Sequence, residues 1–429
     1  MRTVIRNARL ADATGIREEA SDLYLQDGRI EGVDLGGQSD EQYDAGGALL
    51  TPAFIDLHAH LREPGEEVKE DLASGLSAAV AGGYGTVVSM ANTTPAVDEA
   101  GLVTDLRARA EHLGLARLRP AAALSRDLAG KGLTDFAALQ EAGAVMITDD
   151  GVPLEDGHLM RRACEYAAEL GLVIQTHAED PRLRQGGVMN EGFTSQRLGL
   201  PGNPTAAEAV MIYRDCEIAL LTGARVHIAH VTSKRGMQVI EWFKEQGAPI
   251  SAEVTPHHLT LTDEALSGFD PIYKVAPPLR TQQDVDYLRE ALRRGVVDAV
   301  ASDHAPHTLA EKERDLLEAP FGIANLEVAF PLLYTRLVAT GELTLSRLLQ
   351  LFQGGPAEVM AWEEPTLIPG KPADLVLIDP DTPRVADPGR FCSKAKFSPW
   401  AGERLRGWPI MTFVAGCCVY RLEPEAAGR

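Results

Sequence analysis

Short apolar segments alternate along most of this chain with longer segments of helical periodicity. The apolar segments are bounded by turn residues, which is typical of parallel strands buried on both faces. The segments with helical periodicity cover residues 68–81, 98–113, 157–170, 204–221, 233–246 and 282–294. About eight strand-then-helix units can be counted, which is the number that a (β/α)8 TIM-type barrel requires. The sequence therefore predicts an α/β fold of this kind.

One predicted strand begins at Phe54 and ends in the His-x-His pair His58 and His60. Side chains at positions i and i+2 of a strand project from the same face, so the two imidazoles are directed toward one point. Histidine is the commonest metal ligand, and catalytic zinc sites leave one coordination position for water. Taken alone, the pair fits either a metal site or two histidines with ordinary hydrogen bonds.

Four further predicted strands end in histidine or aspartate. The residues that follow these strands are Asp149, Asp150, His177, His230 and Asp303. In a (β/α)8 barrel the C-terminal ends of the strands meet at one face, so side chains from strands 1, 4, 5, 6 and 8 converge there. This convergence favours a metal site over residues that merely cap strands.

The chain of 429 residues is longer than one barrel, which typically takes about 250 residues. Both ends of the chain are rich in predicted strands, with a tight turn at Asp27-Gly28. We expect one small β-sandwich built from both termini. The predicted division is residues 1–50 and 367–429 for the sandwich and residues 51–366 for the barrel.

Charge and composition exclude several classes of partner. The net charge of -21 repels a phosphate backbone, which argues against a nucleic-acid-binding protein. No apolar stretch approaches the roughly 20 residues that cross a bilayer, and no secretory signal is visible at the start. The five cysteines lack metal-type spacing and are expected to be reduced thiols. We expect a cytoplasmic protein that binds neither nucleic acid nor membrane.

The chain closely resembles the bacterial type I dihydroorotases of the amidohydrolase superfamily. The matching motifs occupy residues 58–65, 91–95, 149–151, 177–179, 227–231, 255–259, 303–307 and 320–323. The resemblance implies two zinc ions per subunit, although other divalent ions also suit such ligands. It assigns His58, His60 and Asp303 to the more buried ion, His177 and His230 to the second, and Asp150 as the bridge.

The activity implied by the resemblance is the reversible hydrolysis of L-dihydroorotate to N-carbamoyl-L-aspartate in pyrimidine (UMP) biosynthesis. Two metal ions about 3.5 to 4 Å apart can share a hydroxide that is nucleophilic at neutral pH. Asp303 would be the catalytic residue, first accepting the proton of this nucleophile and then delivering it to the leaving nitrogen.

The resemblance also implies a substrate site. Arg62 would bind the substrate carboxylate, with hydrogen bonds from Asn92 and His307 and backbone contacts at Phe321 and Gly322. From spacing alone, a surface salt bridge from Arg62 to Glu63 or Glu66 fits as well.

Two other functions stay open. Hydantoinases and allantoinases are related cyclic amidases, but many of them bridge the ions with a carboxylated lysine, and residues 145–150 contain no lysine. A non-catalytic scaffold partner of aspartate carbamoyltransferase is the third hypothesis, and an intact ligand set argues against it. Ala276 stands where many type I enzymes have an asparagine that touches the substrate, which bears on substrate choice. We expect a homodimer and hold open an association with aspartate carbamoyltransferase.

The remaining histidines are assigned by strand alternation. His257 and His258 are adjacent, so on a strand they would face opposite ways and only one could reach the metals. His227 is offset from His230 by an odd number of residues and is expected on the other face. His304 is expected to lie behind Asp303. Residues 308–319 are rich in charge and are expected to be a solvated helical connection or a mobile cover.

Overall fold

Eight parallel strands form the centre of the molecule. The computed structural model describes residues 1–12 and 15–423. The barrel strands are β6 (Phe54–Ala59), β7 (Tyr84–Ser89), β8 (Arg117–Ala123), β9 (Met146–Thr148), β10 (Val173–Thr176), β13 (Arg225–Ile228), β14 (Ile250–Val254) and β15 (Ala299–Val300). Each pairs with the next, from β6 to β15. The ring closes where His60 N donates to His304 O at 2.8 Å, beside a parallel bridge between Ala59 and His304. The predicted barrel is confirmed.

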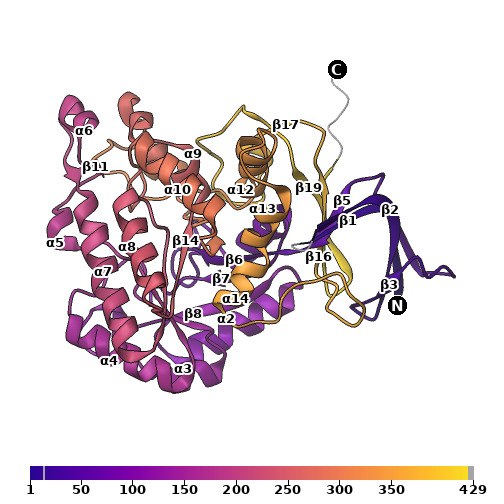
Figure 1. Cartoon of the computed structure of the whole chain (residues 1–429), viewed down its shortest axis with the longest axis horizontal. Helices are drawn as coiled ribbons and strands as arrows, with labels where there is room; N and C mark the ends of the chain where they lie inside the picture. Colours follow the sequence, from indigo (N-terminus) through magenta and orange to yellow (C-terminus); the bar gives the residue numbers. More distant parts are fainter. Residues whose placement is uncertain (13–14, 424–429) are drawn as a thin grey trace.

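Helices cover the outside of the barrel (Figure 1). They are α1 (Leu72–Ala81), α2 (Ala100–Leu113), α3 (Phe136–Ala142), α4 (Gly157–Leu170), α7 (Thr205–Thr222), α8 (Lys234–Glu245), α10 (Gln282–Arg294), α12 (Ala329–Leu333), α13 (Leu345–Phe352) and α14 (Gly354–Val359). Local sequence sets their ends. Helix α1 begins four residues later than predicted because Asp71 caps it, accepting a hydrogen bond from Ser74 N. Helix α4 matches its predicted range, between the Asp156 cap and Gly171 in the left-handed conformation.

The two termini meet in one sheet beside the barrel (Figure 1). Its strands are β1 (Arg2–Asp12), β2 (Gly15–Gln26), β3 (Arg29–Val33), β4 (Glu41–Asp44), β5 (Leu49–Pro52), β16 (Leu375–Asp379), β19 (Trp408–Val414) and β20 (Cys417–Arg421). The sheet encloses a core of its own that includes Ile5, Leu23, Leu375 and Phe413. The predicted β-rich unit from both termini is confirmed, whereas its boundaries at residues 50 and 367 stay predictions.

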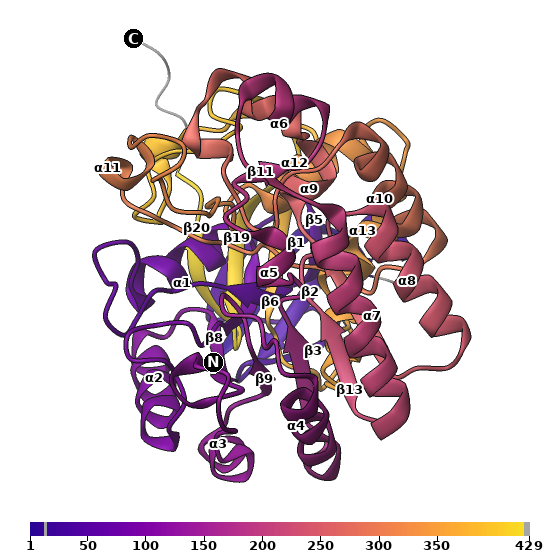
Figure 2. The ribbon, with the colours of Figure 1, turned by 90° about the vertical axis from the view of Figure 1, so that its left-hand side faces the viewer.

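Short elements extend the loops that follow several barrel strands. After β10 come α5 (Pro181–Arg184), β11 (Met189–Asn190), α6 (Phe193–Leu198) and β12 (Gly202–Asn203), and after β14 comes α9 (Pro256–Thr260). Figure 2 shows α6, β11 and α9 gathered on one side of the molecule. No helix of the described residues has both the length and the apolar character that a membrane crossing requires.

The segment 308–319 is largely exposed, as its charge suggested, but it is helical over a short stretch only. Only α11 (Leu309–Lys312) is helical, and Lys312 is buried. Its ammonium donates to the backbone carbonyls of Pro271, Lys274 and Pro320 at 3.0 to 3.2 Å. These hydrogen bonds attach the segment to the neighbouring loop, because a buried ammonium must find acceptors.

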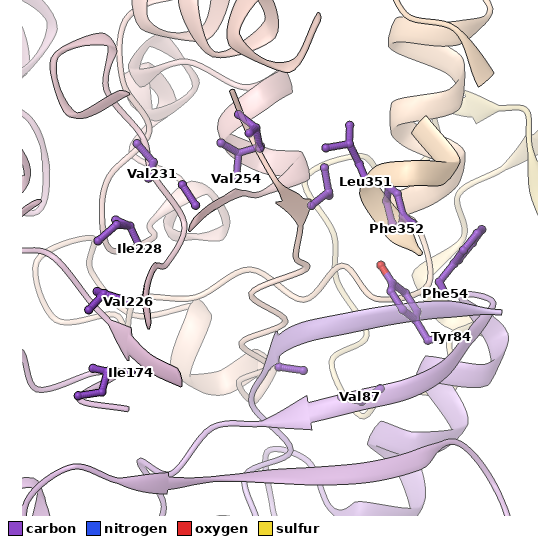
Figure 3. Close-up of a cluster of buried hydrophobic side chains, with 14 of the residues drawn as sticks. Phe54, Tyr84, Val87, Ile174, Val226, Ile228, Val231, Val254, Leu351 and Phe352 are labelled. Atoms are coloured by element: carbon purple, nitrogen blue, oxygen red, sulfur yellow. The ribbon is translucent and has the colours of Figure 1, made fainter. Parts of the chain in front are cut away.

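An aromatic cluster anchors the first two barrel strands against α12 and α13. Phe54 is fully buried, and its ring centroid lies 4.6 Å from that of Phe330, 5.1 Å from that of Phe352 and 5.7 Å from that of Tyr84. Figure 3 shows Phe54, Tyr84 and Phe352 side by side. The cluster fixes the start of β6, the strand whose other end carries His58.

We expect Phe54→Ala to lower the free energy of unfolding by about 3 to 5 kcal/mol, since it leaves a cavity among packed rings. Phe193→Ala is the matched control, because the Phe193 side chain is 77% exposed, and it should change stability by less than about 0.5 kcal/mol. Chemical denaturation measures both. Equal effects in the two variants would contradict this assignment of the core.

Candidate metal centre

The His-x-His pair lies at the C-terminal end of β6 with both rings buried. His58 Nε2 lies 3.3 Å from Asp150 Oδ1, and His60 Nε2 lies 3.2 Å from Asp303 Oδ1. His58, His60 and Asp150 each offer a ligand atom within 4.8 Å of the others. We name this group, together with Asp303, position one.

A second group shares Asp150. His177 Nδ1 and His230 Nε2 lie 3.3 Å and 3.6 Å from Asp150 Oδ1, and the three residues form a compact ligand group of their own. We name Asp150, His177 and His230 position two. The structure thus brings together all six side chains that the sequence suggested as ligands, with Asp150 common to both groups.

Two of the six depend on unusual backbone conformations. His230 has φ 33° and Asp303 has φ 44°, both in the left-handed region that residues with a side chain rarely adopt. Strand alternation stops at these residues, so each side chain turns into the site independently of the faces of the preceding strand. Such strain is common at functional sites, where the surrounding structure holds it.

Burial and mutual charge together shift the pKa values of the cluster. Burial would raise the pKa of Asp150, but the charge of His58 and the hydrogen bond from His177 hold it well below its usual range. Burial would lower the pKa of His177, but hydrogen bonds with Asp150 and Glu179 raise it to about 10. Burial would also raise the pKa of Asp303, but the hydrogen bond from His60 and the charge of His58 lower it. The site therefore keeps both aspartates ionised.

Buried ring nitrogens test whether a metal fits. In the described part of the chain, His58 Nε2 and both ring nitrogens of His230 have no hydrogen-bond partner. An unsatisfied buried polar atom costs free energy, and metal coordination would satisfy His58 Nε2 and His230 Nε2. Four imidazoles and two carboxylates suit zinc and similar divalent ions. The residues fit a two-metal centre.

Arg62 lies inside the protein and not on its surface. Its Nε donates to Pro306 O at 3.1 Å, and its Nη2 lies 3.3 Å from His307 Nε2. Glu66 is 3.9 Å away, and Glu63 instead accepts from Leu72 N at 2.8 Å and pairs with Arg109. The surface salt bridge is therefore the weaker explanation for Arg62.

The other predicted substrate residues adjoin the same region. Asn92 Oδ1 accepts from His60 Nδ1 at 3.0 Å, and Asn92 Nδ2 donates to Asp150 Oδ2 at 3.1 Å. His307 Nε2 donates to Phe321 O at 2.8 Å. Gly322 has φ 146°, and a Cβ there would lie 2.5 Å from Ala305 O, so this backbone requires glycine.

The structure places His257, His258 and His227 differently from the strand alternation that the sequence suggested. His257 and His258 lie on helix α9 and not on a strand, and both side chains are buried. His258 bonds Thr255 and Pro277, whereas His257 Nε2 lies 3.9 Å from Asp303 Oδ2. His227 is not turned away from the site. Its ring and that of His58 both form hydrogen bonds with Glu253, one with each carboxylate oxygen.

His304 lies beside Asp303 without joining the ligand groups. Its Nε2 donates to Glu70 at 3.3 Å, and its Nδ1 accepts from Asn325 N at 3.1 Å. Asp149 accepts from His177 N and Leu154 N, both at 2.8 Å. These residues shape the loops that carry the ligands.

Two buried glutamates were missed from the sequence. Glu253 and Glu179 are fully buried and contact His58 and His177 respectively. A signal for Glu253 was available, because it is the one charged residue in the strand at 250–254.

A (β/α)8 barrel with four histidines and two aspartates at the C-terminal ends of its strands defines a metal-site hydrolase of the amidohydrolase class. A family model described as Dihydro-orotase-like matches residues 47–236. The chain is 54% identical to the dihydroorotase of Deinococcus radiodurans, over 95% of this chain and 97% of that protein. It is 53% identical to the dihydroorotase of Thermus aquaticus, over 97% and 99% of the two chains. The chain belongs to the dihydroorotase family.

Solved structures show the same fold. The L-hydantoinase of Arthrobacter aurescens superimposes with a TM-score of 0.87 at 24% identity, covering 98% of this chain and 96% of that one. The dihydropyrimidinase of Brevibacillus agri gives a TM-score of 0.82 at 22% identity, covering 98% and 95%. At these identities the likeness concerns the architecture.

Metal binding should release protons at pH 8. The pKa of His177 is raised to about 10 and that of His58 is also raised, so the metal-free cluster holds protons there that coordination must displace. The apparent affinity should rise about tenfold per pH unit for each proton released. Calorimetric zinc titrations in buffers of different ionisation enthalpy measure the release. Heats that do not depend on the buffer would contradict the pKa assignment.

Proposed function

We propose that this protein is a dihydroorotase that hydrolyses the cyclic amide of L-dihydroorotate reversibly to N-carbamoyl-L-aspartate, in the cytoplasmic synthesis of pyrimidines. The observation that carries the proposal is the pair of ligand groups sharing Asp150, with the buried Arg62 guanidinium reaching His307 nearby. Relatives more than half identical over nearly the whole chain carry the name dihydroorotase.

We assign position one and position two to zinc. When bound, two such ions would polarise the scissile carbonyl and make a water nucleophilic at neutral pH. His58, His60, Asp150 and Asp303 would hold one ion, and Asp150, His177 and His230 the other.

Asp303 is the candidate acid and base. It is buried, lies 3.2 Å from His60 Nε2 and 3.6 Å from His58 Nε2, and is held ionised by these histidines. An ionised carboxylate can accept a proton from the attacking water and return it to the leaving amide nitrogen.

Substrate selection rests on a local positive charge in an acidic protein. The net charge of -21 would repel an anionic substrate, so binding of its carboxylate requires a group such as Arg62. Asn92 and His307 would add hydrogen bonds. The backbone of Phe321 and Gly322 lies against His307 and Lys274 O, beside the segment that holds Ala276.

The alternative functions find less support. Hydantoin and allantoin carry no carboxylate for Arg62 to bind, and Asp150 occupies the place where a bridging lysine would be needed. A purely structural role does not explain six intact ligands. A homodimer and an association with aspartate carbamoyltransferase are parts of our proposal, and sedimentation of the protein alone and mixed with the transferase tests them.

The substrate assignment predicts that the protein hydrolyses dihydroorotate and hydrolyses hydantoin little or not at all. A chelator should abolish the hydrolysis of dihydroorotate, and added zinc should restore it. The absorbance of each ring measures its opening. Faster turnover of hydantoin would favour the related amidase function. Full turnover of dihydroorotate by chelated protein would contradict a metal centre.

For Asp303→Asn we expect kcat to fall about 10² to 10⁴-fold, since an amide cannot relay the proton. Asp105→Asn, at an exposed position of α2, is the control and should keep the normal kcat. Initial rates give kcat, and the metal content of each variant shows whether the loss exceeds any loss of metal. Turnover near normal in Asp303→Asn would refute its role.

For Arg62→Lys we expect KM for dihydroorotate to rise about 10- to 100-fold, because charge-assisted hydrogen bonds contribute about 1.5 to 3 kcal/mol and an ammonium cannot provide the fork. The metal content should stay unchanged. An unaltered KM would show that the substrate carboxylate binds elsewhere.

A further inference from the structure

Each metal position has one histidine whose outer nitrogen faces a buried glutamate. In position one, His58 Nδ1 lies 2.9 Å from Glu253 Oε1. In position two, His177 Nε2 lies 3.5 Å from Glu179 Oε2. The other two histidine ligands have no such support, because His60 Nδ1 contacts the neutral Asn92 amide and His230 Nδ1 has no partner among the described residues.

We propose that Glu253 and Glu179 are positioning residues that set the metal affinity of position one and position two separately. The inference rests on the two-metal centre of the proposed function and goes beyond it, because neither glutamate is a ligand. Carboxylates behind a metal-binding imidazole fix its tautomer and raise the basicity of the coordinating nitrogen.

The hydrogen-bond directions at Glu253 follow from the chemistry of the groups. A carboxylate only accepts, so His58 Nδ1 carries the proton and Nε2 presents its lone pair toward Asp150 and Asp303. Glu253 Oε2 accepts from His227 Nε2 at 3.0 Å, and His227 Nδ1 accepts from Ser251 Oγ at 2.8 Å. This chain of buried groups holds both carboxylate oxygens of Glu253.

Glu179 is held differently. Its Oε2 accepts from Arg184 Nη1 at 2.8 Å, and its Oε1 accepts from Asn203 Nδ2 at 2.6 Å. His177 Nε2 therefore carries the proton, and Nδ1 faces Asp150. Because the Arg184 charge offsets that of Glu179, this glutamate supports its histidine less strongly than Glu253 does.

A purely structural role explains Glu253 poorly. Glu253 is fully buried, and within residues 1–12 and 15–423 no lysine or arginine forms an ion pair with it, whereas burying a carboxylate is costly. A neutral hydrogen-bonding side chain could link the two histidines at a lower cost of desolvation. A full negative charge behind His58 has its clearest use when a cation binds at His58 Nε2.

The experiment compares Glu253→Gln, Glu179→Gln and the control Glu327→Gln. Glu327 is also buried, and it accepts from Cys392 N and Ser393 N at 3.0 and 3.1 Å without touching a ligand histidine. Zinc affinities come from competition with a chromophoric chelator on metal-free protein. Anomalous diffraction at limiting zinc identifies the position that loses occupancy, and thermal unfolding of the metal-free proteins measures any general loss of stability.

We expect Glu253→Gln to weaken zinc binding about 100-fold at position one and Glu179→Gln about 10-fold at position two, the range seen when such partners are removed. Glu327→Gln should keep both affinities. Wild-type affinity in both test variants, equal losses at both positions, or the same loss in the control would overturn the proposal. Wild-type protein that binds two zinc ions but does not open dihydroorotate would refute the proposed function alone.

Discussion

The site depends on one buried carboxylate that two groups of histidines share. Asp150 lies within 3.6 Å of a ring nitrogen from each of four histidines, which come from β6, β10 and β13 and the residues that follow them. The carboxylate of Asp150 offsets positive charge on the imidazoles around it, and metal ions would use the lone pairs of the ring nitrogens that have no hydrogen-bond partner among the described residues. The barrel supplies the geometry, because it carries the ends of distant strands to a common face.

Much of the fold could be predicted because the capping residues, the apolar periodicity and the turn residues indicate the same helices and strands. Helix α4 has a capping aspartate, an apolar face and a terminal glycine, so its range was recovered residue by residue. The start of α1 was missed because the Asp71 cap is a local hydrogen bond that periodicity does not report. The division of the chain at residues 50 and 367 is not decided by the fold, since β5 extends from Leu49 to Pro52.

The candidate site was predictable where side chains follow regular strands and not where the backbone departs from them. His58 and His60 obey strand alternation, and their convergence could be inferred. Alternation failed for His227, because the chain turns at His230 into a left-handed conformation. Of His257 and His258 only one lies near a ligand residue, as expected, although both are on a short helix and not on a strand. Contacts between strands far apart in sequence, such as that of Glu253 with His58, are set by the closure of the barrel. Their only trace in the sequence is a single charged residue within a buried strand.

The region around Arg62, where we propose that the substrate carboxylate binds, holds a buried positive charge in an acidic protein. Arg62 is buried beside His307, held by Pro306 O, and its acidic neighbour Glu66 is 3.9 Å away. A guanidinium fixed in this way keeps its charge and its planar fork available. In our proposal, the two metal positions act on the amide of the substrate ring and the guanidinium of Arg62 binds its carboxylate.

The most direct test of this account is a zinc titration of the metal-free protein in which bound metal and dihydroorotate hydrolysis are followed together. The account predicts that turnover appears only as zinc binds and reaches its maximum at two ions per chain. Full turnover without bound metal, or zinc binding at two equivalents with no turnover of this substrate, would contradict it.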